Sequence, residues 1–338
     1  MRIIVIICWG DYTAPQEDEN IKTVLDGVIS KLSPSKVEYV RGCAIRDTTV
    51  NEIAEVVEAA SRSEVIIAVV GGSSARDFKT SYQETGAAIA DEKSISDMEC
   101  GEGFDRATLT LLGKQQDLLN ALKATGKPLI VVYIEGRPLD KVWASEYADA
   151  LLTASYPGQE GGYAIADVLF GDYNPAGRLP VSVPRSVGQI PVYYNKKAPC
   201  NHDYVEQAAS PLYTFGYGLS YTTFEYSDLQ VMRKSPCYFE VSFKVKNTGS
   251  YDGEEVAQLY LRDEYASVVQ PLRQLKCFER FFLKRGEEKE IFFTLTEKDL
   301  SIIDRNMKRV VETGDFRLMI GASSDDIRLT KDISVESL

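Results

Sequence analysis

The chain has 338 residues, 44% of them apolar, a length that suits two domains with ordinary hydrophobic cores. Acidic residues outnumber basic ones by 50 to 38, for a net charge of −12, and no Lys- or Arg-rich run interrupts that balance. This charge pattern argues against nucleic acid as a partner. No apolar stretch is long enough to cross a bilayer, so we expect no membrane span.

Cysteine and histidine usage narrows the possible chemistry. Six cysteines occur without a C-x-x-C pair, and His202 is the single histidine, which predicts free thiols and no metal site. A Ser-His-Asp or Cys-His site could be built only around His202, and no nucleophile elbow lies near it. The Gly-Gly-Ser-Ser run at 71–74 lacks the spacing of a phosphate-binding loop, and we expect no cofactor. Carboxylates remain as the natural acid–base groups, which suits sugar chemistry.

The first 170 residues or so alternate short apolar runs with segments of helical period, which predicts a layered α/β domain with a largely parallel sheet. The expected strands span 2–7, 36–40, 65–70, 129–134 and 150–154. The expected helices span 20–32, 51–61, 111–125 and 160–170. In the third helix, leucines recur at spacings of three and four, which predicts a stripe facing the core.

One connection, residues 71–109, is unusually long and follows the carboxyl end of a predicted strand, where open α/β sheets place their ligand sites. It contains the sequence Gly-Glu-Gly-Phe-Asp-Arg at 101–106. The two glycines permit turn conformations and close approach of a substrate, and Asp105 and Arg106 are expected to pair locally. Glu102 is therefore the candidate acid catalyst. Weaker candidates, for which local ion pairing is the alternative, are Glu84, Glu92, Glu99 and Asp105.

Other residues of the chain are candidate sugar contacts. Arg76 and Asp77 lie in the same long loop and are possible substrate-binding groups together with Asp105 and Arg106, although they could equally tie the loop to itself. The Tyr- and Gly-rich segment 213–221 offers rings on which sugars could stack. Packing at a domain interface explains that segment better.

The second half of the chain has a different pattern. Residues 171–215 are rich in Pro, Gly, Asn and Tyr, as in linkers and turns. Alternating strands follow without intervening helices, at 238–247, 255–262, 272–283, 288–296, 314–322 and 327–335. This pattern predicts an immunoglobulin- or fibronectin type III-like β-sandwich. We therefore expect an α/β three-layer sandwich with a mostly parallel sheet over 1–185, a linker over 186–215 and an all-β sandwich over 216–338.

Four blocks of sequence, in register, carry a family resemblance. They are GEGFDR at 101–106 followed by LLGKQQ at 111–116, YPGQEGG at 156–162, GDYNPAGRLP at 171–180 and YTFGYGLSYTTF at 213–224. Together they resemble the C-terminal part of a family 3 glycoside hydrolase of the β-glucosidase and β-xylosidase type, over most of the chain. The resemblance implies an α/β-sandwich domain, a fibronectin type III-like domain, a β-glycoside substrate and Glu102 as the general acid/base of a retaining enzyme.

The same resemblance implies an incomplete site. The family's nucleophile is an Asp on a preceding (β/α)8 barrel, and a barrel needs on the order of 250 residues that this sequence does not contain. We therefore expect a truncated or disrupted reading frame from Met1 that supplies Glu102 but not the nucleophile and is inactive alone. The alternative is a non-catalytic carbohydrate-binding or assembly module that docks on a separate barrel. Either hypothesis predicts a barrel domain or subunit as partner and an exposed apolar patch.

The compartment is not assigned by the sequence. The N-terminal apolar run has six residues, shorter than the core of a secretion signal, and there is no N-x-S/T acceptor. The resemblance implies full-length relatives that are periplasmic or secreted.

Overall fold

The computed structural model describes residues 10, 13, 18–75, 81–85, 88–89, 96–101, 103–197 and 202–336. The chain divides into two compact units, one of Met1–Tyr173 with Arg185–Gly188 and the other of Asn174–Pro184 with Gln189–Leu338. The domain limits expected from the sequence, with a linker over 186–215, stay a prediction.

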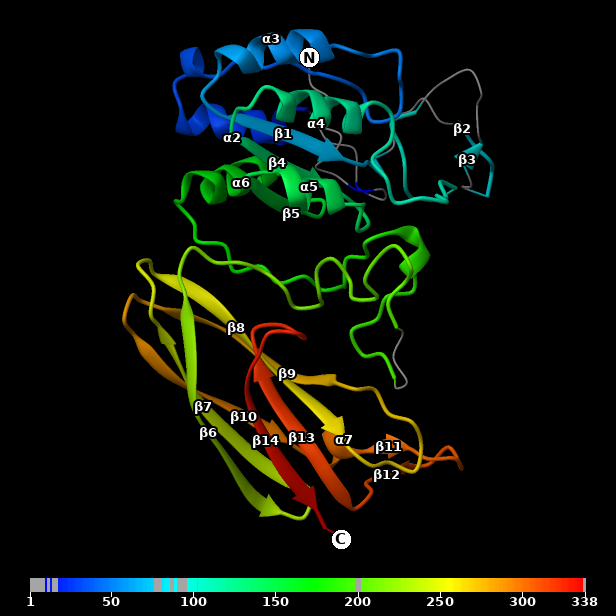
Figure 1. Ribbon diagram of the computed structural model, residues 1–338, viewed down its shortest axis with the longest axis vertical. Coiled ribbons are helices and arrows are strands. Elements are labelled where there is room, and N and C mark those ends of the chain that lie inside the picture. The colour runs from blue at the N-terminus through cyan, green and yellow to red at the C-terminus, as the bar shows by residue number, and fades with distance from the viewer. Residues whose placement is uncertain are drawn as a thin grey trace. The chain divides into compact units, whose positions relative to one another are not determined.

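The first unit is built on a parallel sheet (Figure 1). Its strands, in the order β1–β4–β5, are β1 Ile66–Gly71, β4 Leu129–Ile134 and β5 Ala150–Ala154. Ile66 pairs with Leu129, and Ile130 pairs with Ala150, both in parallel register. The central strand β4 is almost wholly buried, because helices cover both faces, and this explains its continuous apolar sequence.

Helices lie on both faces of this sheet. They are α2 Val24–Lys31, α3 Ile53–Arg62, α4 Gln115–Ala124, α5 Val142–Tyr147 and α6 Gly161–Phe170. Helices α3, α4 and α5 share a core with strand residues such as Ile66 and Val131, whereas α2 and α6 share one with Ile67 and Val132. Because successive strand residues point to opposite faces, these two cores confirm the three-layer α/β sandwich. The buried leucines of α4 confirm the predicted stripe.

One local prediction needs correction, and one helix was not predicted. Segment 36–40 is not a strand: a 3-10 turn, η2 Pro34–Lys36, precedes it, and residues 37–40 pair with no described strand. A strand forms only where a neighbouring strand offers hydrogen-bond partners, and an apolar sequence does not reveal whether such a neighbour exists. Glu38 of this segment instead forms an ion pair with Arg62 of α3. Helix α5 is too short for its period to be recognised in the sequence. The predicted strand 2–7 lies outside the described residues.

The remaining short elements are η1 Asp18–Asn20, β2 Ser81–Tyr82, β3 Ala88–Ile89 and η3 Val187–Gln189.

Helices α2 and α6 touch through glycine. A Cβ atom on Gly162 would lie 1.9 Å from the Thr23 carbonyl oxygen, and one on Gly27 would lie 2.1 Å from the Gly162 carbonyl oxygen. The Gly162 amide also donates a hydrogen bond of 3.0 Å to the Lys22 carbonyl. The sequence block YPGQEGG at 156–162 therefore ends in a glycine that the backbone contact requires.

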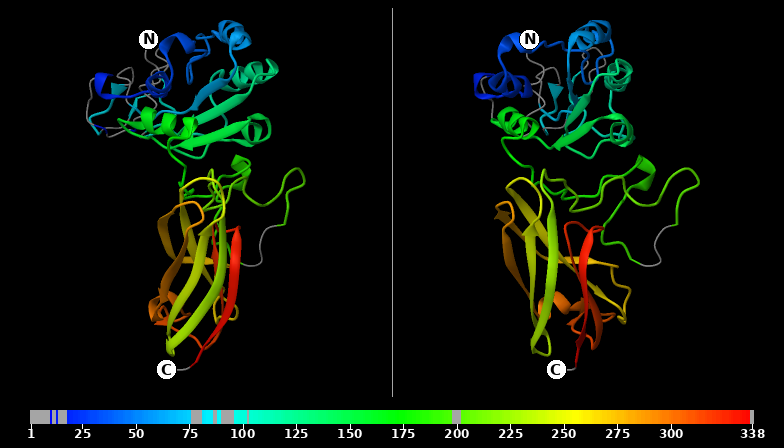
Figure 2. Two further views of the ribbon diagram at one scale, coloured as in Figure 1. Left: turned by 90° about the vertical axis from the view of Figure 1, so that its left-hand side faces the viewer. Right: turned by 60° about the vertical axis from the view of Figure 1, so that its left-hand side comes forward.

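The second unit contains two antiparallel sheets that face each other across one core (Figure 2). The strand orders are β14–β13–β8–β9 and β10–β7–β6. The strands are β6 Phe224–Ser235, β7 Tyr238–Asn247, β8 Gly253–Asp263, β9 Gln274–Leu283, β10 Glu288–Leu295, β13 Gly314–Gly321 and β14 Ile327–Val335. The short elements are α7 Glu297–Leu300, β11 Ile302–Ile303 and β12 Arg309–Val310. This arrangement confirms the β-sandwich; β6 escaped the sequence analysis because half of it is exposed and polar.

Irregular segments of the second unit are fixed to its sheets. The Arg178 guanidinium lies 2.6 Å from the Glu255 carboxylate of β8, and both side chains are less than a tenth exposed. Farther along, the ring of Tyr194 stacks on Phe215 at 4.2 Å and meets Tyr260 of β8 edge-on. The ring of Phe215, from the Tyr- and Gly-rich segment, is thus used for packing within this unit.

Replacing Gly162 by alanine tests the α2–α6 contact. The added methyl would strike backbone rather than a movable side chain, so we expect the first unit to lose about 1–3 kcal/mol of unfolding free energy. Gly188→Ala is the matched control, since its nearest neighbour would lie 3.7 Å from the new carbon. Chemical denaturation followed by circular dichroism measures both. Equal stability of the two variants would refute the tight contact.

Candidate active-site loop

The candidate site is the long loop between β1 and α4, at the carboxyl end of the parallel sheet. The loop is anchored where it leaves β1 by Gln115, the first residue of α4. The Gln115 carboxamide accepts a hydrogen bond of 2.8 Å from the Gly71 amide and donates one of 2.9 Å to the Gly71 carbonyl. A side chain thereby takes the place of a neighbouring strand, and both ends of the loop are held together.

The returning part of the loop runs beside its beginning. The Glu99 amide donates to the Ser73 carbonyl at 2.8 Å, and the Arg46 guanidinium donates to the Met98 carbonyl at the same distance. Met98 is fully buried. Residues 98–100 are consequently fixed to the end of β1 before the chain turns at Gly101.

A buried ion pair holds the turn that follows. Nη1 of Arg106 donates to Oε2 of Glu99 at 2.6 Å, and the side chains are 6% and 1% exposed. The Arg106 guanidinium also bonds the Thr110 carbonyl. The segment that joins Glu99 to Arg106 therefore begins and ends at residues that are held together. We call this pair the loop clamp.

One oxygen of the Glu99 carboxylate lies outside the ion pair. Oε1 of Glu99 is buried and has no partner among the described residues. It faces Gly72, where an added Cβ atom would lie 2.1 Å away from it. Any side chain at position 72 would displace the carboxylate, so glycine is required beside the clamp.

Two glycines of the enclosed turn have backbone conformations that side chains rarely adopt. The φ angle is 105° at Gly101 and 82° at Gly103. These values confirm that the glycines on both sides of position 102 serve the turn conformation. The two glycines allow the backbone conformation at these positions, and the loop clamp holds the ends of the segment.

A thiol–phenol contact supports the same loop from the sheet side. The Cys100 sulfur lies 3.1 Å from the Tyr156 hydroxyl. Burial raises the pKa of the Cys100 thiol and of the Tyr156 phenol, so both groups stay protonated near neutral pH. Their role is packing and hydrogen bonding rather than nucleophilic chemistry.

The predicted site residues fall into two groups. Glu102, Arg76 and Asp77 lie outside the described residues, as does Glu92, so their predicted roles stay predictions. Arg106 is placed in the clamp, and its partner is Glu99 rather than the expected Asp105. Asp105 is exposed and forms no ion pair within the described part of the chain. For Glu99, the local ion pairing that the sequence left open is confirmed.

A second buried ion pair lies where β4 ends, and the sequence gives no sign of it. The Lys141 ammonium donates to both oxygens of Glu135 at 2.6 Å, and the Glu135 carboxylate also accepts from the Leu139 amide at 3.0 Å. Burial raises the pKa of Glu135 and lowers that of Lys141, while the charge of each partner opposes the shift. The pair fixes the loop after β4, at the same edge of the sheet as the candidate site.

The described part of the chain shows neither a metal-binding cluster nor a helix suited to cross a membrane. No cluster of three or more His, Cys, Asp or Glu side chains in the described ranges could hold a metal ion. None of the helices formed by these residues combines the length and apolar character needed to traverse a membrane.

Comparison with known protein families gives two matches. The family model described as "Glycosyl hydrolase family 3 C-terminal domain" matches residues 6–221. The model described as "Fibronectin type III-like domain" matches residues 255–324.

The relatives that this chain matches are about twice as long as the chain or longer. A β-xylosidase of Formosa agariphila is 40% identical over 316 residues, covering 90% of this chain and 40% of the relative. A periplasmic β-glucosidase of Salmonella typhimurium is 43% identical over 292 residues, covering 82% of this chain and 35% of the relative. Among solved structures, a β-glucosidase from Listeria innocua in complex with glucose has a TM-score of 0.82 at 29% sequence identity. The match covers 97% of this chain and 44% of that structure. The chain thus spans less than half of each relative.

The loop clamp can be tested by its stability. Arg106→Met leaves the Glu99 carboxylate buried without its cation, which we expect to cost about 3–5 kcal/mol of unfolding free energy. The double variant Glu99→Gln/Arg106→Met should recover part of that loss, because no unpaired charge remains. Urea denaturation measures the unfolding free energy of each variant in this double-mutant cycle.

The control for this cycle is Arg62→Met, which removes two ion pairs, with Glu38 and Glu58, whose side chains are all about half exposed or more. We expect a far smaller loss, since water replaces the lost partner. Losses of the same size in the Arg106 and Arg62 variants would contradict the clamp.

Proposed function

This chain belongs to glycosyl hydrolase family 3, as its C-terminal portion, and from that premise we propose that it supplies the acid/base part of a retaining β-glycosidase. The proposed enzyme class is β-glucosidase or β-xylosidase, the two activities named for its relatives. The observation that carries the proposal is the loop clamp of Glu99 and Arg106, which encloses position 102 at the carboxyl edge of the sheet.

Glu102 is the proposed general acid/base. In the first step it protonates the departing glycosidic oxygen while a second carboxylate attacks the anomeric carbon and forms a glycosyl-enzyme. In the second step the Glu102 carboxylate removes a proton from the water that hydrolyses this intermediate. The nucleophile is proposed to come from a (β/α)8 barrel, and the site works only when that barrel lies against this loop.

The clamp supports this role because a general acid acts only at a fixed distance from the oxygen that it protonates. Glycines with positive φ on both sides let the backbone present one side chain at a sharp turn. Arg76, Asp77 and Asp105 are proposed as sugar contacts from the same loop. For Arg106, the buried bond to Glu99 favours a part in holding the turn.

The proposal is tested by joining this chain with the barrel portion of a full-length relative. The mixture should hydrolyse aryl β-glucosides or β-xylosides, whereas the chain alone should not. Glu102→Gln should lower the rate on substrates with poor leaving groups about 10²- to 10⁴-fold, because protonation of the leaving oxygen is lost. Dinitrophenyl glycosides need no such proton, and azide should restore their turnover by attacking the glycosyl-enzyme without a general base.

The matched control is Glu84→Gln, since Glu84 is an exposed carboxylate of the same long loop. It should retain the activity of the mixture. If activity restored by the barrel is unchanged in Glu102→Gln, the chain is a non-catalytic assembly module instead. If the chain alone hydrolyses the substrates, its nucleophile lies within these residues and the proposed division of the site is wrong.

A further inference from the structure

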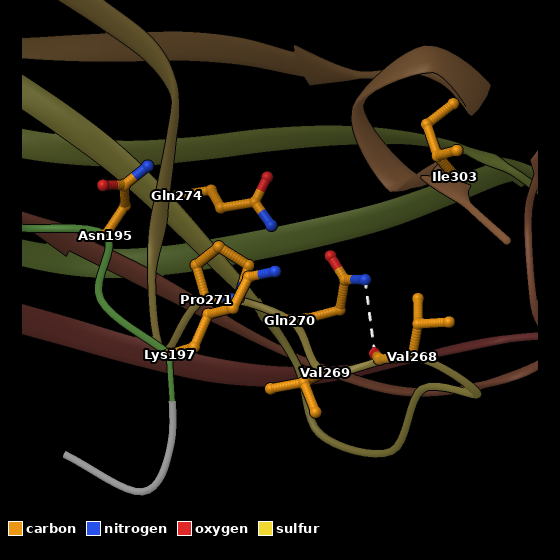
Figure 3. A pocket seen from close by; sticks show the side chains of 8 residues that line it. All are labelled: Asn195, Lys197, Val268, Val269, Gln270, Pro271, Gln274 and Ile303. Carbon is orange, nitrogen blue, oxygen red and sulfur yellow. Dashed lines mark hydrogen bonds between the residues drawn. The ribbon is translucent and has the colours of Figure 1, made fainter. Parts of the chain in front are cut away.

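The second unit contains a pocket far from the candidate loop in sequence (Figure 3). Its volume is about 490 Å³, within the range of small-ligand sites. Two separate segments and β11 form it: its lining consists of Asn195, Lys197, Val268, Val269, Gln270, Pro271, Gln274 and Ile303.

Three carboxamides dominate the polar side of this pocket, and two of them are held in place. Nε2 of Gln270 donates to the Val268 carbonyl at 3.3 Å, which leaves its amide oxygen as an acceptor. Oε1 of Gln274 accepts from Lys276 at 3.1 Å, which leaves its amide nitrogen as a donor. Asn195 adds a third, exposed carboxamide. The pocket therefore presents both hydrogen-bond donors and acceptors, and the two glutamines are held in place.

The walls of the pocket are joined by backbone contacts. Lys197 forms a β-bridge with Pro271, and the Leu272 amide donates to the Lys196 carbonyl at 2.9 Å. The Leu275 amide donates to the Tyr194 hydroxyl, whose ring stacks on Phe215. Because these contacts connect segment 194–197 to the start of β9, the pocket exists before any ligand binds.

The lining chemistry selects among ligand classes. An apolar ligand would displace water from the amide groups of Gln270, Gln274 and Asn195 without replacing its hydrogen bonds, which is costly. A strongly anionic ligand would meet a single cation, Lys197, and a cationic ligand would meet no carboxylate among the described lining residues. A neutral ligand rich in hydroxyl groups satisfies both donors and acceptors, and its C–H surfaces can lie against Val269, Pro271 and Ile303.

We propose that this pocket binds a neutral oligosaccharide, as a carbohydrate site separate from the candidate catalytic loop. The site does not depend on Glu102 or on a barrel, since all of its described lining belongs to the second unit. It would hold a sugar chain on the protein without cleaving it.

Isothermal titration of the purified chain with cellotetraose, xylotetraose and maltotetraose tests the proposal. We expect saturable binding of at least one of them. Gln274→Ala and Asn195→Ala should each weaken that binding about tenfold, the effect of one lost hydrogen bond to a ligand. Gln230→Ala, an exposed carboxamide of β6 away from the pocket, should bind as the unmodified chain does.

Several outcomes would overturn the proposal. One is no saturable binding of any of the three sugars, and another is unchanged affinity in Gln274→Ala and Asn195→Ala variants whose circular dichroism shows a native fold. A third is binding that is lost in Glu102→Gln but kept in both pocket variants, because the sugar then occupies the catalytic loop. That last result would leave the proposed function standing, so the two hypotheses fail separately.

Discussion

The candidate site depends above all on one buried ion pair, the loop clamp of Glu99 and Arg106. Removing two charges from water is unfavourable, and this cost is offset by the attraction within the pair and by the hydrogen bonds that the guanidinium donates to the Thr108 hydroxyl and the Thr110 carbonyl. Gly72 leaves the room that the carboxylate occupies. Such a pair contributes less to net stability than to defining one conformation. The segment between the two residues of the clamp contains Glu102, the proposed acid, in the sequence.

The rest of the first unit fixes the base of that turn. Helix α4 is held to β1 by the Gln115 carboxamide, and the loop after β4 is held by the Glu135–Lys141 pair. Both contacts lie at the carboxyl edge of the sheet, so the loops that meet there are attached to rigid elements. These contacts hold the loops at this edge in one conformation, which is the condition that the proposed general acid requires.

The second unit uses the same physical devices for a different purpose. A buried pair, Arg178 with Glu255, fixes one irregular segment to β8, and stacked aromatic rings fix another. The second of these segments forms one wall of the carboxamide-lined pocket. The pocket is proposed to bind sugar because its lining offers hydrogen-bond donors and acceptors beside apolar surface and little charge.

The sequence alone determined the two architectures, because burial leaves a period in the chain: continuous apolar runs in β4 and alternation in β7. It also indicated the glycine-bounded turn, since φ angles are local. It did not reveal that residues 37–40 pair with no described strand, that Arg106 pairs with Glu99, or that Asn195 and Gln274 line one pocket. Those features were decided by the tertiary structure, because ion-pair partners and cavities depend on which distant segments meet, and no local pattern records that.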